Sequence, residues 1–476
     1  MKKLDKITPW KENFAQWYVD VIKNGELMEY GPIKGTIIFK PNSYAIWENI
    51  QLELNNLFKT KGIQNVYLPM LIPEFFINIE KEHVEGFSHE LVTVTQVGEK
   101  KLHDNLYIRP TSEVLFADLF KKSIESYKDL PLIYNQWTSV MRWEKTTNPF
   151  LRNTEFLWQE GHTVHANAME ARKLTRDMIK LYEKFLRKYL AIPTIMGKKT
   201  PKEKFAGACS TYTVEAMMKD GKALQSATSH YLAQNFSRAF KIAFKNKNNE
   251  DEFAYQTSWG VSTRLLGAII MTHGDDSGII MPPKIAPVQV DILELFSNKY
   301  PEVSEKVDEL ERWLSKKLRV RVDRSDAQPG FKAANSEIQG VPVRIEVGPK
   351  DLAENMVTVV RRDTFEKTRV NISKVREYVE ELLIEIHENL YTQAKKRLEN
   401  NTVIAYDYDS FKKAISENKF VITPFNGDEE EEERIKKETG ATTRCIPFKY
   451  LKPKDDCTCI TSGKLTKRFV LFAKAY

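Results

Sequence analysis

The sequence is poor in the features that mark secreted and membrane proteins. It has four cysteines in 476 residues, which argues against a disulfide framework. No segment approaches the run of about 18 apolar residues that a membrane helix needs. No apolar run follows the basic N-terminal residues as it would in a secretory signal. We therefore expect a cytoplasmic protein with no membrane partner.

The remaining composition is that of an ordinary globular protein. Hydrophobic residues make up 42% of the chain and charged residues 29%, as in soluble domains. The formal net charge of +7 is a modest basic excess, which permits a nucleic-acid partner without requiring one. The chain is too long for a single hydrophobic core, so its length favours about three domains.

One predicted hairpin carries many ionisable and aromatic side chains on one face. A strand that starts near Leu132 alternates with period two as far as Arg142 and Glu144, and Asn148-Pro149 marks the loop. The return strand places these residues on one face: Arg152, Phe156, Trp158, Glu160 and His162. Arginine suits phosphate and a ring suits a base, so the face fits a nucleotide-like ligand. The alternative is a partly exposed ion-pair network over a sheet.

Two stretches before this hairpin also carry signals. A helix is predicted over residues 42–61, with Asn42 or Ser43 as its cap and Gly62 as its stop, and a strand over 66–71 follows. Pro69 confines that strand to a sheet edge, which either serves a dimer or is simply exposed. The second stretch runs from a strand near Leu106 into a helix that starts around Thr111, Ser112 and Glu113. Such residues often only cap a helix.

Three further stretches follow the hairpin. An amphipathic helix is predicted over residues 168–186, before Pro193. The segment 225–232 has small and polar residues that a ligand could approach, or it is a plain polar turn. A strand from Tyr255 leads into an apolar helix with Arg264 in its first turn. An arginine at the positive end of a helix indicates a bound anion, unless it reaches back to a carboxylate.

Taken together, these stretches resemble the three signature motifs of class II aminoacyl-tRNA synthetases. The first motif, which forms the dimer interface in that class, is similar to Lys61-Gly62 through Leu71. The second is similar to Arg142-Trp143-Glu144 with its return strand, and the third to Gly260 through Arg264. Arg109 to Glu113 and Phe156 to His162 resemble the prolyl-tRNA synthetase family, of the archaeal and eukaryotic type. The similarity runs from Trp10 nearly to Tyr476.

The resemblance implies an α/β (α+β) protein of three domains. Residues 1–283 would form a class II catalytic domain with an antiparallel sheet flanked by helices, 284–399 an α/β anticodon-binding domain, and 400–476 a small α/β domain. It implies ATP-dependent activation of L-proline to prolyl-adenylate and transfer to the 3′ end of tRNA(Pro), by a homodimer that uses Mg²⁺. The Pro282-Pro283 linker and the strand and helix alternation after it agree with the second domain.

The resemblance also implies roles for individual residues. Arg142 and Arg264 would be the catalytic residues. The proline site would comprise Thr111, Glu113, Arg142, Trp158, His162 and His230. The ATP site would comprise Arg142, Arg152, Phe156, Gln225, Thr228, Ser262 and Arg264, with Gln225 near a phosphate-bound Mg²⁺. Glu337 and Arg344 would read the anticodon, unless these charges are merely solvated.

The sequence departs from the family pattern in the C-terminal domain, where many members carry a four-cysteine zinc site. Cys457 and Cys459 match one ligand pair, but Asn426 and Glu431 stand in place of the other. Structural zinc favours four Cys or His ligands, so we expect no zinc or a degenerate site. The chain between Thr163 and Gly260 is also too short for the editing insertion of the other bacterial branch.

Two other functions compete with proline activation. A synthetase-like regulatory RNA binder would be expected to lose some of Arg142, Arg152 and Arg264, yet all are present. A class II synthetase for another small amino acid, such as threonine, would be expected to have cysteine and histidine zinc ligands in its pocket. Cys209 is the only cysteine in the catalytic region.

Overall fold

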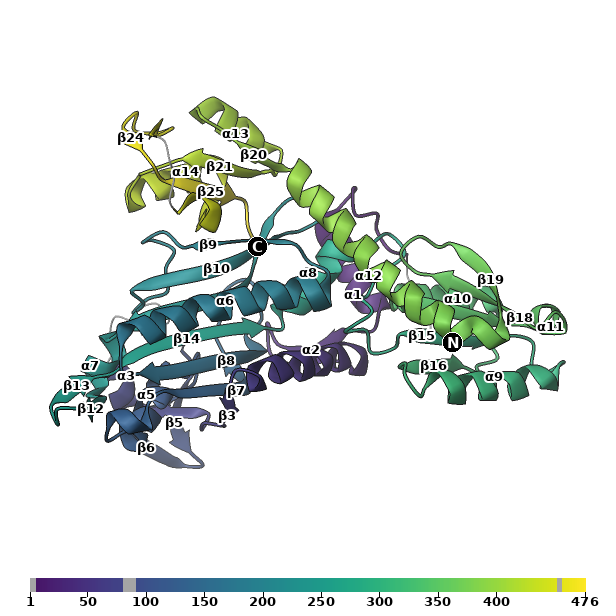
Figure 1. Cartoon of the computed structure of the whole chain (residues 1–476), viewed down its shortest axis with the longest axis horizontal. Helices are drawn as coiled ribbons and strands as arrows, with labels where there is room; N and C mark the ends of the chain where they lie inside the picture. Colours follow the sequence, from purple (N-terminus) through teal and green to yellow (C-terminus); the bar gives the residue numbers. More distant parts are fainter. Residues whose placement is uncertain (1–5, 80–90, 452–455) are drawn as a thin grey trace.

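The computed structural model describes residues 6–79, 91–451 and 456–476. They form a mixed α/β structure with a large, mainly antiparallel sheet, a five-stranded mixed sheet and a small C-terminal region (Figure 1). The expected fold class is therefore confirmed.

The large sheet is the platform of the N-terminal region. Its strands in this region lie in the order β9, β10, β11, β14, β8, β7, β3. Their bounds are β3 Gln64–Asn65, β7 Leu132–Met141, β8 Glu155–His165, β9 Thr194–Lys198, β10 Ser210–Met217, β11 Ala223–Ala233 and β14 Tyr255–Ser262. The strands are antiparallel except for the parallel pair β3 and β7.

Helix α6 (Ala168–Leu190) covers one face of this sheet. Asn167 caps its start by accepting a hydrogen bond from the amide of Glu170, and Ala191 ends it in the left-handed conformation. Its buried face includes Tyr182, whose hydroxyl donates to Gln159 Oε1 of β8 at 2.6 Å. The predicted amphipathic helix is confirmed, and the opposite sheet face is left for other groups.

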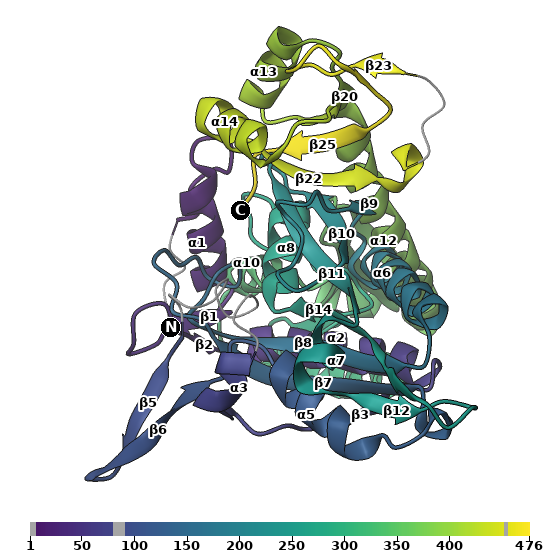
Figure 2. The same cartoon turned by 90° about the vertical axis from the view of Figure 1, so that its left-hand side faces the viewer.

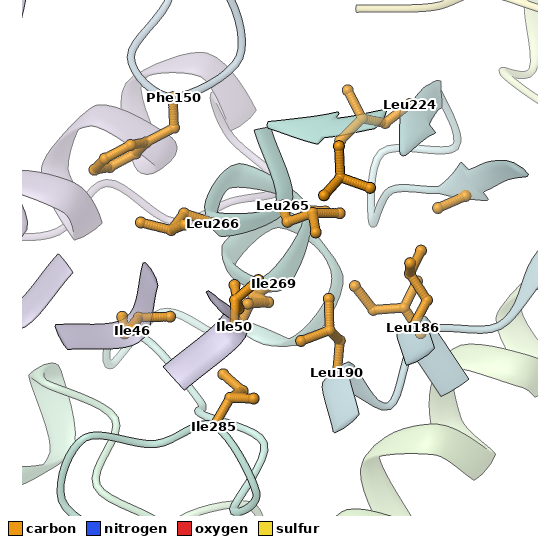
Figure 3. Packing of buried hydrophobic residues seen from close by; sticks show 14 of the residues in the cluster. Ile46, Ile50, Phe150, Leu186, Leu190, Leu224, Leu265, Leu266, Ile269 and Ile285 are labelled. Carbon is orange, nitrogen blue, oxygen red and sulfur yellow. The ribbon is translucent and has the colours of Figure 1, made fainter. Parts of the chain in front are cut away.

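Helix α8 (Arg264–His273) continues directly from β14 into the main hydrophobic core. Figure 3 shows Leu265, Leu266 and Ile269 of α8 among side chains from α2 (Pro41–Lys59), α6 and β11. The buried apolar residues that follow Arg264 hold its backbone in place. The predicted strand and helix at this junction are confirmed.

The expected boundaries near α2 were partly wrong. Pro41 is the first residue of the helix and Lys40 its cap, so Asn42 and Ser43 lie inside the first turn, where Ser43 donates to the carbonyl of Leu27. The helix ends at Lys59, and Gly62 (φ +73°) forms the turn beyond it.

The single strand expected over residues 66–71 is two short strands, β3 and β4 (Leu71–Pro73). Pro69 lies between them, where its missing N–H costs no ladder bond. The predicted edge position is confirmed, because β3 is the terminal strand of the large sheet.

A smaller sheet leads into the site. Its order is β4, β6, β5, with β5 at Thr93–Val97 and β6 at Lys100–Ile108, and it projects from the body in Figure 2. Helix α5 (Glu113–Ser123) follows β6, as predicted. Other elements of the N-terminal region are α1 Phe14–Asn24, β1 Met28–Tyr30, β2 Ile37–Phe39, α3 Glu74–Ile79, α7 Asn235–Phe240, β12 Ala243–Lys245 and β13 Asp251–Phe253.

The middle region has its own sheet and core. The strand order is β16, β15, β17, β18, β19, with the first three strands parallel. The elements are β15 Val290–Glu294, α9 Pro301–Leu314, β16 Val320–Asp323, α10 Pro329–Ile338, β17 Val343–Val347, α11 Pro349–Ala353, β18 Met356–Arg361, β19 Lys367–Asn371 and α12 Val375–Asn400. The expected strand and helix alternation is present, with boundaries shifted by a few residues.

The C-terminal region extends the large sheet instead of forming a separate one. Its elements are β20 Thr402–Ile404, α13 Tyr408–Ser416, β21 Phe420–Pro424, α14 Glu429–Thr439, β22 Thr442–Pro447, β23 Cys457–Thr458, β24 Leu465–Thr466 and β25 Phe469–Ala473. Strand β22 pairs with β9 through Ile446 and Pro447. The chain end then returns to the catalytic sheet, where the amide of Tyr476 donates to the carbonyl of Ala223 at 3.1 Å.

Candidate active site

The sheet register brings polar residues from five strands into two parallel rows on the face opposite α6. One row runs Tyr134, His162, Ser258, His230, Thr211, and the next Gln136, Glu160, Gly260, Thr228, Thr213. Directly opposed residues on antiparallel strands point to the same side of a sheet. Side chains that lie far apart in the sequence are therefore neighbours here.

These rows form the floor of a cavity of about 290 Å³. Eleven of the predicted site residues line it: Thr111, Glu113, Arg142, Phe156, Trp158, His162, Gln225, Thr228, His230, Ser262 and Arg264. The predicted one-face arrangement of Phe156, Trp158, Glu160 and His162 is confirmed. Arg152 does not line the cavity, and its Nη1 lies 3.7 Å from Glu144 Oε2.

The hairpin is shorter than expected. Strand β7 ends at Met141 and β8 begins at Glu155, so Arg142 and Arg152 belong to the connection. Arg142 reaches the cavity because its Nε donates to the carbonyl of Pro110 at 3.1 Å. Its guanidinium lies 5.5 Å from the ring centres of both Phe156 and Trp158, a cation–π arrangement that holds its plane.

The carboxylate of Glu160 organises one end of the cavity. It accepts hydrogen bonds from Ser112 N (3.1 Å), Ser112 Oγ (2.5 Å), Gln136 Nε2 (2.9 Å) and His162 Nε2 (3.1 Å). The side chain of Ser112 therefore serves the site and does not cap α5, which corrects the capping interpretation for this residue. The ring of His162 stacks on Phe116 with centres 4.1 Å apart.

Two more groups complete this end. The Thr111 hydroxyl donates to Glu113 Oε2, so a buried carboxylate faces the cavity beside that of Glu160. His230 Nδ1 shares a hydrogen bond of 2.9 Å with Thr211 Oγ1, and Phe205 lies against its ring at 4.5 Å. The enclosure of two carboxylates by rings suits a small cationic group with apolar flanks.

The other end of the cavity is cationic. Burial, together with the nearby charges of Arg152 and Arg142, lowers the pKa of Arg264 to about 10. Arg264 donates to the carbonyls of Leu151 (3.1 Å) and Gln225 (3.4 Å). Both of these acceptors are main-chain carbonyls, so the hydrogen bonds do not support the alternative in which the arginine reaches back to a carboxylate. Mutually repelling arginines at a helix start are stabilised by an anion.

The sequence left two interpretations of segment 225–232, a segment that a ligand could approach and a plain polar turn. The polar-turn interpretation is wrong. The segment lies in β11, a central strand, and a β-bulge at Ser226 separates the pairs Val214–Ala227 and Glu215–Gln225. Bulges re-aim side chains beside functional sites. Gln225 and Thr228 both line the cavity as a result.

Several lining residues were not predicted from the sequence. They are Lys199, Glu203, Phe205, Thr211, Ser258 and Gly260. Ser258 and Gly260 share the parity of Ser262 on β14, which was a usable signal. Lys199, Glu203 and Phe205 lie in a connection without periodicity, and only its tertiary contacts place them at the cavity.

Glu113, Glu160 and His162 form the one group of potential metal ligands found among the described residues, with their ligand atoms within 4.8 Å. Four protein donors already occupy the Glu160 oxygens, which favours a hydrogen-bonding role over metal ligation.

The cysteine segment of the C-terminal region is tied together by side-chain hydrogen bonds. Thr461 Oγ1 donates to Glu431 at 3.0 Å, and Ser462 Oγ donates to Asn426 at 3.1 Å. Burial alone would raise the pKa of Cys459, but hydrogen bonds from Ser462 and Thr461 outweigh it and lower the pKa to about 7. Asn426 and Glu431 thus contact the loop that follows Cys459.

The candidate anticodon residues contact each other in the middle region. Arg344 is buried and donates to Glu337 at 2.7 Å and to Glu346 at 3.0 Å. Nearby, Arg361 donates hydrogen bonds through Nε and Nη2 to the two carboxylate oxygens of Asp363.

Comparisons with known proteins agree with this geometry. A family model described as "tRNA synthetase class II core domain (G, H, P, S and T)" matches residues 94–273. An "Anticodon binding domain" model matches residues 286–382, and "Prolyl-tRNA synthetase, C-terminal" matches 408–476. The Proline--tRNA ligases of Mycoplasmopsis pulmonis and Mycoplasmopsis synoviae are 64% and 62% identical over the whole of both chains. The chain belongs to the proline--tRNA ligase family.

Family membership accounts for all three regions of the fold. The Proline--tRNA ligase of Lachnospira eligens is 49% identical over 100% of this chain and 99% of its own, so the similarity is not confined to the catalytic motifs.

In the part of the chain that the structure describes, no helix has the length and apolar character needed to cross a bilayer.

Proposed function

We propose that this chain activates L-proline with ATP and transfers the prolyl group to the 3′ end of tRNA(Pro). The observation that carries this proposal is a single cavity with a carboxylate end and an arginine end, in a chain 64% identical to a Proline--tRNA ligase. The carboxylate end fits an imino group flanked by an apolar ring. The arginine end fits a triphosphate.

In the first step, the proline carboxylate attacks the α-phosphorus of ATP and pyrophosphate leaves. Glu113 accepts hydrogen bonds from the imino group, while Trp158, His162 and His230 enclose the ring. Arg142 contacts the carboxylate and then the α-phosphate. Because both reactants are anions, positioning and charge neutralisation supply the catalysis, and no protein nucleophile is needed.

The nucleotide is held by the remaining predicted residues. Phe156 stacks on adenine opposite Arg264, Arg152 and Arg264 bind phosphate oxygens, and Gln225, Thr228 and Ser262 bind polar edges. The mutual effect of the arginines on the pKa of Arg264 supports an anionic ligand here. Mg²⁺ near Gln225 would neutralise phosphate charge when bound.

We propose that the three domains divide at residues 283 and 399, with the middle one reading the tRNA anticodon through Glu337 and Arg344. The pairing of Arg344 with Glu337 supports a preorganised reader. The C-terminal domain is proposed to fold without a four-cysteine zinc site.

A cytoplasmic homodimer is the proposed working form. Strand β3 is an exposed sheet edge, and Tyr67, Met70 and Leu71 beside it are 70%, 44% and 40% exposed. Large apolar side chains at an edge favour association.

The decisive experiment is amino-acid-dependent exchange of labelled pyrophosphate into ATP. Proline is expected to stimulate it more than any other amino acid. Arg142→Ala is expected to abolish it while the unfolding transition stays in place. Absence of proline-stimulated exchange, or stronger exchange with another amino acid, would contradict the proposal.

A further inference from the structure

The connection between β9 and β10 forms one wall of the cavity. The C-terminal region contacts this connection on the side that faces away from the cavity. Lys199, Glu203 and Phe205 of this connection line the cavity. Phe205 lies on the ring of His230, and its amide donates to Thr211 Oγ1 at 3.0 Å. The position of this connection, residues 199–208, therefore sets the shape of the cavity beside His230.

The outer contacts come from the acidic start of α14 and from β22. Glu432 is 5% exposed, and its Oε2 accepts from Thr200 Oγ1 at 3.1 Å and from Thr443 Oγ1 at 2.6 Å. Lys202 Nζ lies 2.7 Å from Glu433 Oε2. One buried carboxylate thus ties the connection to β22.

A second set of contacts involves Lys199, the first residue of the connection. Lys199 Nζ donates to Glu215 Oε1 at 3.0 Å, and Arg444 of β22 donates to Glu215 Oε2 through Nε and Nη2 at 3.0 and 2.9 Å. All three side chains are buried. Glu215 stands opposite Gln225 in the sheet, and both Gln225 and Lys199 line the cavity, so this cluster lies beside the cavity wall on the same face of the sheet.

We propose that the C-terminal region is a structural part of the amino-acid pocket and that Glu432 is a positioning residue for it. Glu432 touches no reacting group. It fixes Thr200, and through it the connection that presents Glu203 and Phe205. This inference rests on the proposed proline activation, because it assigns the wall to the amino-acid end of that site.

The test compares matched variants of the full chain by pyrophosphate exchange. Glu432→Ala removes the shared acceptor, and Thr200→Val removes its donor from the other side. Glu430→Ala is the control, since Glu430 is exposed on the same helix and carries the same charge. Each test variant is expected to raise the KM for proline about 10-fold, as the loss of one buried hydrogen bond would. The KM for ATP is expected to stay within about 2-fold.

The double variant separates a shared interaction from two separate ones. Thr200→Val with Glu432→Ala is expected to raise the KM for proline no further than either single change, because both remove the same contact. Additive effects, an unchanged KM for proline, or equal rises for proline and ATP would overturn the inference.

A second readout does not depend on activity. Trypsin cleaves after lysine, and the connection holds Lys199, Lys202 and Lys204. Glu432→Ala is expected to speed cleavage in it by about 5-fold or more over Glu430→Ala, because the segment opens more often. Equal cleavage rates would overturn the inference. If the unaltered protein showed no exchange with proline, the proposed function would fail, while the cleavage rates would still decide whether α14 holds the connection.

Discussion

At the scale of single residues, the site depends on carboxylates whose partners are polar and buried. Glu160 could be placed on the right face from the parity of its strand, but its partners could not be predicted. Ser112 and Gln136 come from other elements, and only the fold brings them within 3.2 Å of each other. We therefore read Glu160 as the residue that orders His162 and the start of α5.

Replacement of Glu160 tests this role. Glu160→Ala leaves the donors of Ser112 and His162 without their acceptor, while Gln136 Nε2 keeps the hydroxyl of Ser112 as its acceptor. Each buried donor left unsatisfied is expected to cost about 1–3 kcal/mol of the free energy of unfolding. Urea denaturation measures this loss. A variant as stable as the unaltered protein would show that water replaces the carboxylate. Glu155→Ala, at the exposed start of the same strand, is the control.

At the scale of elements, β8 and β14 pack so closely that one strand position requires glycine. Gly161 of β8 faces Trp259 of β14, and a Cβ there would lie only 2.1–2.3 Å from three carbons of the indole ring. The pattern of the sequence marked the resemblance around Gly161 but not this packing reason. The close approach puts the large ring of Trp259 beneath α6, on the side away from the cavity.

Gly161→Ala is expected to destabilise the fold by about 1–3 kcal/mol, the usual cost of overpacking. Gly330→Ala is the matched control, since a Cβ at this position in α10 meets nothing within 4 Å. It is expected to be neutral or to stabilise by up to about 1 kcal/mol. Thermal or urea unfolding compares the two. Equal effects would contradict the packing account.

The contact between α8 and the end of α6 makes stability depend on pH. Burial lowers the pKa of His273 to about 3, although its ring donates to the carbonyl of Leu190 at 2.8 Å. The unfolded chain binds a proton below about pH 6.5, whereas the folded chain does so only near pH 3. The unfolded state therefore holds more protons between these values, and stability falls as the pH falls through them.

The free energy of unfolding is expected to drop by up to about 1.4 kcal/mol per pH unit from this residue below pH 6. His273→Gln should reduce that slope, while its effect at pH 8 reports the lost packing and hydrogen bond alone. Urea titrations from pH 4 to pH 8 measure both. An unchanged slope in the variant would contradict the assignment to His273.

At the scale of the whole molecule, an ion pair joins the middle region to the end of α8. Arg362 donates to Asp275 at 2.8 and 2.6 Å, and its Nε donates to the carbonyl of Glu337 at 2.8 Å. Arg362 is 1% exposed at its side chain and Asp275 is 28% exposed. Arg362 therefore has its ion-pair partner outside the middle region.

The two partners are expected to differ in their effect on stability. Asp275→Ala leaves the buried Arg362 uncompensated, which costs about 3–5 kcal/mol for a pair of this kind. Arg362→Ala leaves a carboxylate that water can reach, so the loss is expected to be smaller. Denaturant unfolding of both variants measures the difference. A larger loss for Arg362→Ala would contradict the burial argument.

The class of fold, the family and about half of the residues that line the cavity could be predicted from the sequence alone. Period-two alternation placed Phe156, Trp158 and His162 on one face, and the junction before Arg264 followed from local pattern. The strand order, the lining role of Lys199 and Phe205, and the contacts of α14 with the connection that holds them became visible only in the folded structure. The physical reason is that periodicity reports which face a residue takes, while partners from distant segments depend on sheet register and packing.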